Sequence, residues 1–210
     1  MTDVTLTKDD APVVDGPVGY ADGPVPDETT NTGLSNTKLG MWVFLGSECL
    51  LFGGLISAYL LYKRNNSAGG PLPHDLFDIE LTSISSFVLL MSSLTMVLAV
   101  SAIQRGDHSR LRLWLVTTAL LGSVFISGQV YEFQVFVKEG FGFTTNAASS
   151  AFFGLTGFHG VHVTIGIIML LTTALLSRAG RIPQSRAESV EIVGLYWHFV
   201  DIVWVLIFTV

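Results

Sequence analysis

Ionisable side chains lie inside segments of the chain that are otherwise apolar enough to lie in lipid. His159 and His162 fall in one such segment, 150–163, and His198 and Asp201 fall in another, 196–204. The two residues of each pair are three apart, so on a helix they share a face, and we predict that His198 pairs with Asp201. A charged group at the middle of a bilayer costs about 2.5–3.5 kcal/mol even on the lenient insertion scale. We therefore expect these side chains to face protein or a wet cavity and to mark where the chain makes contacts.

A carboxyl group, Glu48, lies well inside the first apolar segment. Burial favours the protonated form of such an acid unless a cation or hydrogen-bond donors compensate. Two interpretations stay open: a carboxyl that handles protons or contacts a partner, and a buried acid that is hydrogen-bonded for packing. Glu132 shares a helix face with Gln129 in the third apolar segment, and we interpret this pair as an interhelical clamp.

The histidines allow a metal interpretation and a packing interpretation. His159 and His162 could suggest a haem or metal pair, but a site within the membrane would need further ligands, such as His198 or Glu132, at the same point. The other two of the five histidines fall in predicted loops on opposite sides of the membrane. We therefore expect the imidazoles to hydrogen-bond across helices, and we predict no catalytic, cofactor-binding or metal-binding residue in this chain.

Small residues repeat every four positions beside the paired histidines, at Thr156, Gly160 and Thr164. A stripe of this kind lets another helix approach closely. Trp197 and Trp204 lie on either side of His198 and Asp201 in the sequence. We predict that Thr156, Gly160 and the two tryptophans contact a neighbouring subunit.

Arg178 and Glu191 flank the loop between the last two apolar segments, at the depth of a lipid headgroup. A basic group at that depth suits an anionic phosphate. We predict a lipid-headgroup site at these two residues. The alternative for Arg178 is an ordinary anchor of the kind that the positive-inside rule describes.

The composition places these residues in an integral membrane protein. Half of the residues are apolar, the mean hydropathy is +0.56 and only 13% are charged, whereas soluble domains carry about 25% charged residues. A membrane-spanning helix needs about 20 apolar residues. Five segments meet this requirement, so we predict an all-α membrane protein with five transmembrane helices, at 39–62, 80–103, 111–137, 149–176 and 190–210. The single cysteine, Cys49, builds neither a disulfide framework nor a thiolate metal site.

The chain begins with a stretch of different composition. Residues 1–37 are acidic and contain four prolines, so we predict a disordered N-terminal tail followed by a five-helix domain over 38–210. Eight of the eleven Lys and Arg residues lie on the side of the tail and of the loops after the second and fourth segments. Because cytoplasmic loops are enriched in these residues, we predict a cytoplasmic N-terminus and an external C-terminus.

Several motifs together resemble one known family. They are Thr-Gly-Phe-His-Gly-Val-His-Val at 156–163, Tyr-Trp-His-Phe-Val-Asp-Ile-Val-Trp at 196–204, Ser-Glu at 47–48, Gln-Val-Tyr-Glu at 129–132 and Leu-Leu-Met-Ser-Ser at 89–93. Over 38–210 the chain resembles subunit III of the haem-copper terminal oxidases, the cytochrome c oxidase subunit III family. With five spans it is similar to the shorter bacterial forms.

The resemblance implies a non-catalytic subunit of an aa3-type cytochrome c oxidase in the bacterial plasma membrane. Such a subunit docks on subunit I, which holds haem and copper, beside subunit II and the other subunits. It binds phospholipids and supports proton translocation while oxygen is reduced to water. By position, Glu48 matches the family's membrane carboxyl, and Arg178 roughly matches its lipid-headgroup arginine. The buried polar residues of interest are then Glu48, Glu132, His159, His162, His198 and Asp201.

Other functions stay open at this point. The same role in a quinol oxidase, or in a homologue associated with nitric oxide reductase, fits the same residues. A small transporter or a metal-binding membrane protein belongs to a different class, which stoichiometric metal in the isolated chain would favour. Membership of a respiratory supercomplex is also open, and no nucleic-acid partner is expected.

Overall fold

A computed structural model describes residues 35–64, 79–140 and 142–210. The chain divides into two units, 1–36 and 37–210, and the structure below is that of the second unit. The predicted disordered tail, apart from its last three residues, lies outside the described residues.

Five long helices make up the described part of the chain, with a short 3-10 helix, η1 (Gln184–Arg186), before the last one. All five are long and apolar enough to cross a membrane, which confirms the predicted class and the number of spans. They begin one to three residues before the predicted segments, and all but α6 end one or two residues after them. The helices are α1 (Asn36–Arg64), α3 (Ile79–Gln104), α4 (His108–Lys138), α5 (Ala147–Arg178) and α6 (Ala187–Thr209).

The turn between α3 and α4 is built by a glycine and a capping acid. Gly106 adopts a φ of 74°, a conformation that glycine tolerates best. The Asp107 side chain then accepts a hydrogen bond of 3.0 Å from the backbone N–H of Arg110, which caps α4. This bond, helped by the nearby arginine charge, holds the pKa of the Asp107 carboxyl below its usual range. The short turn makes α3 and α4 antiparallel neighbours.

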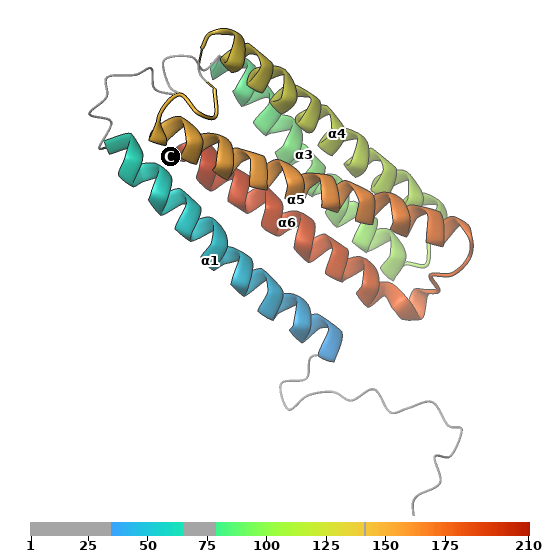
Figure 1. Ribbon diagram of the computed structural model, residues 1–210. Coiled ribbons are helices and arrows are strands. Elements are labelled where there is room, and N and C mark those ends of the chain that lie inside the picture. The colour runs from blue at the N-terminus through green and yellow to red at the C-terminus, as the bar shows by residue number, and fades with distance from the viewer. Residues whose placement is uncertain (1–34, 65–78, 141) are drawn as a thin grey trace, which may run out of the picture. The chain divides into compact units, whose positions relative to one another are not determined.

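Four helices pack as a bundle in which α4 and α6 each lie against both α3 and α5 (Figure 1). Helix α1 joins this bundle through side chains along its length, and two of these contacts lie at its ends. Lys38 Nζ lies 3.0 Å from Glu191 Oε2 near the start of α6, and Lys63 Nζ donates a 2.7 Å bond to the main-chain oxygen of Val210. Because their starts meet and their ends meet, α1 and α6 run parallel.

One tryptophan of α6 contacts the three other helices of the bundle. Trp197 has no exposed surface, and its indole N–H donates a 2.9 Å bond to Ser92 Oγ on α3. A Cβ placed on Gly122 of α4 would lie 2.6 Å from the indole, and one placed on Gly166 of α5 would lie 2.8 Å from it. These two glycines therefore form the slot that the indole fills.

Trp204, two turns further along α6, repeats this arrangement. Its N–H donates a 2.9 Å bond to Ser86 Oγ on α3. Its ring lies edge-on to Phe125 of α4, with 4.7 Å between centroids, and stacks on His159 of α5 at 4.9 Å. The two indoles thus form successive layers of the bundle core.

The prediction that both tryptophans contact a neighbouring subunit is corrected by their positions. Trp197 and Trp204 are buried within the chain's own bundle, as is Thr156, because α6 inserts its indoles between α3, α4 and α5. Gly160 is partly exposed, and a Cβ there would lie 3.0 Å from Gln129 Oε1. Thr156 therefore packs within this chain, whereas the subunit contact at Gly160 stays a prediction.

Candidate functional site

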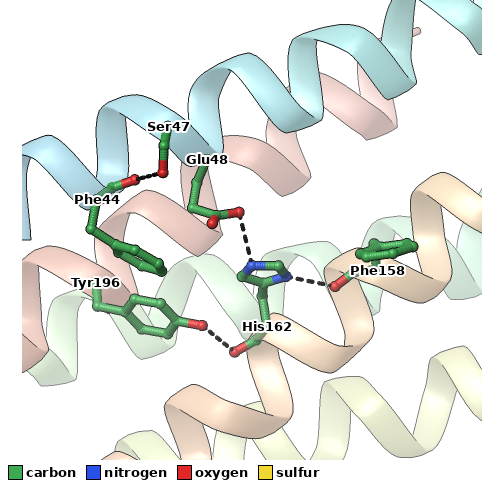
Figure 2. Close-up of polar contacts among 6 residues, drawn as sticks. All are labelled: Phe44, Ser47, Glu48, Phe158, His162 and Tyr196. Carbon is green, nitrogen blue, oxygen red and sulfur yellow. Dashed lines mark hydrogen bonds and ion pairs between the residues drawn. The ribbon is translucent and has the colours of Figure 1, made fainter.

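A carboxyl group of α1 meets an imidazole of α5 in the middle of the two helices (Figure 2). Glu48 Oε2 lies 3.2 Å from His162 Nε2, and the two side chains are 15% and 12% exposed. The other ring nitrogen, His162 Nδ1, lies 2.8 Å from the main-chain oxygen of Phe158, one turn earlier on α5. Glu48 was predicted from the sequence as a buried acid, and the structure shows its partner.

These two contacts fix how many protons the pair holds. A carbonyl oxygen only accepts, so His162 Nδ1 must carry a proton to bond Phe158. The 3.2 Å contact between Nε2 and the Glu48 carboxyl then requires one further proton between them. That proton sits either on the carboxyl of a neutral pair or on the imidazole of an ion pair. In both forms the pair has no net charge, which suits its depth in the membrane.

Aromatic rings surround this proton-sharing pair. Phe52 of α1 lies edge-on to the His162 ring at 5.1 Å between centroids. Tyr196 of α6 stacks near the same ring at 6.5 Å, and its hydroxyl donates a 3.1 Å bond to the main-chain oxygen of His162. Phe44 of α1 stacks in turn on Tyr196. The pair therefore lies where α1, α5 and α6 meet.

His159 has different surroundings, although it is only three residues from His162. Its side chain is fully buried between the rings of Trp204 and Phe125. Neither of its ring nitrogens has a hydrogen-bond partner among the described residues. The two histidines thus face different helices, His159 toward α4 and α6 and His162 toward α1.

Glu132 and Gln129 of α4 bond to two different helices. The Thr82 hydroxyl of α3 donates to Glu132 Oε1, and Gln129 Nε2 donates a 3.2 Å bond to the main-chain oxygen of Thr156 on α5. Each bond joins α4 to a neighbour, which is the arrangement expected of an interhelical clamp.

His198 and Asp201 of α6 do not pair with each other as predicted. His198 Nδ1 lies 2.6 Å from Ser93 Oγ of α3. Asp201 is 3% exposed, and neither of its oxygens makes a regular hydrogen bond to the described residues. The cross-helix serine takes the place of the i+3 carboxylate as the partner of His198.

The two residues predicted to hold a lipid headgroup lie in separate places. Arg178 lies with Arg112 of α4 beside a groove between α4 and α5. Glu191 instead accepts bonds from Lys38 and from Gln104 Nε2, each of 3.0 Å, near the start of α6. A shared headgroup site at Arg178 and Glu191 is therefore not formed within this chain.

Three imidazoles within the helices, those of His159, His162 and His198, pack against other groups of this chain. His162 uses Nδ1 for a carbonyl and Nε2 for Glu48, His198 Nδ1 faces a serine, and the His159 ring is enclosed by aromatic rings. Within 35–64, 79–140 and 142–210, no three His, Cys, Asp or Glu side chains gather as a metal site. The fold and these contacts define a helical membrane subunit whose buried polar groups join its helices.

Comparison with known proteins agrees with this class. The family model described as cytochrome c oxidase subunit III matches residues 22–210. The cytochrome c oxidase subunit 3 of Bacillus sp. (strain PS3) is 39% identical over 88% of this chain and 89% of its own length. The quinol oxidase subunit 3 of Bacillus subtilis (strain 168) is 42% identical over 81% of this chain and 83% of its own length. The chain belongs to the cytochrome c oxidase subunit III family.

Sequence reasoning missed the hydroxyl partners of the buried polar groups. Four hydroxyl groups of α3 form hydrogen bonds with polar side chains of α4 and α6. They belong to Thr82, Ser86, Ser92 and Ser93. Hydroxyls in apolar helices are common hydrogen-bond partners across helices. Serine and threonine residues cluster at 82–95 in the sequence, and this cluster was the signal that could have identified the partners.

Proposed function

We propose that this chain is the non-catalytic subunit III of a haem-copper oxidase and docks on subunit I, where oxygen is reduced to water. Relatives named as oxidase subunits 3 match most of the chain at about 40% identity, which supports membership of such a complex. The observation that carries this proposal is the match of residues 22–210 to the cytochrome c oxidase subunit III family. We expect haem and copper in the partner subunits.

The Glu48–His162 pair is the group that we assign to proton support. Its two partners share one proton between Glu48 and His162 Nε2, and the pair carries no net charge. Moving that proton between the two partners changes the dipole of the pair but not its net charge, so it costs less than bringing an unpaired charge to the same depth. We propose that it sustains proton uptake by subunit I during turnover.

The electron donor has two candidates. We propose reduced cytochrome c, as in an aa3-type oxidase, on the likeness to the subunit of strain PS3. A quinol is an equally supported second candidate, because the B. subtilis quinol oxidase subunit 3 is 42% identical.

The orientation in a bacterial plasma membrane follows from charge. Among the described residues, seven Lys and Arg lie at the end where α1, α4 and α6 begin, and three lie at the other end. The positive-inside rule places the richer end in the cytoplasm. The N-terminus is then cytoplasmic and the C-terminus external.

The groove between α4 and α5 is where we propose that an anionic phospholipid binds. It measures about 630 Å³, and Arg112 and Arg178 reach it from two different helices at its cytoplasmic end. The two guanidinium groups can bind the phosphate of a lipid headgroup, and the apolar groove can hold its acyl chains. The apolar walls are Leu113, Val116, Leu171, Ala174 and Leu175.

Replacing both arginines, as Arg112→Gln and Arg178→Gln, should deplete anionic phospholipid from the purified complex. Each basic residue near an anionic surface contributes about 1 kcal/mol, so we expect retention to fall on the order of tenfold or more. Lipid mass spectrometry of the detergent-purified complex measures this. Arg181→Gln, in the loop that follows α5, is the matched control, and an equal loss in that variant would contradict the site.

Purification of the native complex through a tag on this chain tests the proposed function. We expect subunits I and II to co-elute, with haem and copper bound to them and not to this chain. Oxygen uptake with reduced cytochrome c and with a quinol, each as sole donor, assigns the donor. A chain that elutes without larger partners, or that retains stoichiometric haem or metal alone, would overturn the proposal.

A further inference from the structure

A second groove between α4 and α5 lies closer to the end of α4 than the groove that holds Arg112 and Arg178. It measures about 320 Å³, and small residues of α5 line one side of it. A Cβ placed on one of them, Gly157, would meet nothing within 4 Å, so this chain leaves the space beside it open. We call it the Gln129 groove, and its lining includes Gln129, Val130 and Phe133 of α4 and Gly157, Gly160 and Thr164 of α5.

Gln129 presents a hydrogen-bond acceptor to this groove. Its side chain is 6% exposed, and its Nε2 donates a 3.2 Å bond to the main-chain oxygen of Thr156. Its Oε1 accepts no hydrogen bond from the part of the chain that the structure describes. This oxygen lies beside Gly160, where a Cβ would be 3.0 Å away. Gln129 is therefore a buried amide with its N–H bonded and its oxygen facing the groove.

Lipid offers no hydrogen-bond donor at the depth of this oxygen. From Gln129 to Lys138, where α4 ends, the helix axis advances about 14 Å. Acyl chains have no polar hydrogen, and the ester oxygens of a phospholipid only accept hydrogen bonds. Because a buried polar atom without a partner is unfavourable, the Gln129 oxygen favours a covering protein segment that carries a donor.

We propose that a transmembrane helix of another subunit docks in the Gln129 groove and donates a hydrogen bond to Gln129 Oε1. The donor is a hydroxyl or amide side chain. Small residues of that helix face Gly157 and Gly160, as in closely packed helix pairs within membranes. This inference rests on the proposed function, since an oxidase complex supplies the partner helix.

The surface around the groove is long enough for a helix. A further hollow shares Val130 and Phe133 with the Gln129 groove. It continues along α4 to Gln134 and Lys138. From Ile126 to Lys138 the helix makes about three turns. A partner helix can therefore pack along α4 over this length, with polar contacts near the end of α4.

Photo-crosslinking of the native complex tests the proposal. A leucine-sized diazirine amino acid replaces one of three valines at a time: Val130 or Val161, which line the groove, or Val124, which does not. The three are matched, since their side chains are 51%, 56% and 57% exposed. A carbene reacts with atoms in contact, so we expect at least about fivefold more adduct with another subunit from either groove position than from Val124. Mass spectrometry should map both groove adducts to one transmembrane segment that carries a donor side chain.

Gly157→Leu tests whether the groove itself holds the partner. The new side chain has room in this chain and enters the groove, so it should lower the Val130 adduct by at least about fivefold through overpacking. Gly154→Leu is the matched control, because a Cβ there also meets nothing within 4 Å and Gly154 does not line the groove. An unchanged adduct in Gly157→Leu, or an equal loss in Gly154→Leu, would overturn the proposal.

The nature of the adduct separates this inference from the proposed function. If subunits with haem and copper co-elute but Val130 and Val161 yield only lipid adducts, or adducts with a second copy of this chain, the docked helix is ruled out and the proposed function stands. If the chain elutes with no partner subunit, both fail.

Discussion

Gly166→Ala is expected to disrupt the packing of α5 on α6. The new methyl group would lie 2.8 Å and 2.9 Å from two atoms of the Trp197 ring. That ring is fully buried and is fixed by its bond to Ser92, so it has little room to move. Overpacking of this kind typically costs about 1–3 kcal/mol. The fraction of this chain that stays in the purified complex on heating measures the effect.

Gly154→Ala is the control on the same helix. A Cβ at Gly154 meets nothing within 4 Å, and alanine is intrinsically the better helix former by about 1 kcal/mol. We expect this variant to be neutral or slightly stabilised. If both variants lose the same amount of complex, the slot for Trp197 is not what Gly166 provides.

His162→Leu is expected to detach α1 from the bundle. It leaves the Glu48 carboxyl facing α5 without its 3.2 Å partner. Removing one member of a buried pair typically costs about 3–5 kcal/mol, because the other is left uncompensated. Limited proteolysis between α1 and α3 reports the detachment. The double variant Glu48→Leu with His162→Leu removes the uncompensated group and should recover much of the loss.

The Glu48→Gln variant should keep the contact with His162 and remove the proton that the two side chains share. The amide N–H of glutamine can donate to His162 Nε2, so the junction of α1 and α5 should stay closed. The variant cannot pass a proton to the imidazole and back. Structure and assembly should therefore be retained while proton sharing is lost.

The helices and the depth of the polar residues could be predicted from the sequence, because apolar length and the energy of burying charge decide both. The five spans appear close to the predicted segments. Glu48 was recognised because an acid in lipid must have a partner. Which partner it has depends on how α1 lies along α5, and no periodicity within one helix reports that.

The partners of α6 were predicted less well for a physical reason. A spacing of three suggested that His198 pairs with Asp201, yet Ser93 of α3 is the partner of His198. Trp197 and Trp204 were expected at a subunit contact, and instead they fill the bundle core. Lipid gives apolar residues no preference between inside and outside. Hydropathy therefore cannot tell a core tryptophan from a surface one in a membrane.

Oxygen uptake by the Glu48→Gln complex, followed through many turnovers beside its optical haem spectrum, tests whether the Glu48–His162 pair supports proton uptake. We expect an unchanged haem spectrum, a normal initial rate and a faster decline of activity during turnover. A shifted or lost haem spectrum would place a redox centre at this chain. An unchanged decline would remove the Glu48–His162 pair from proton support.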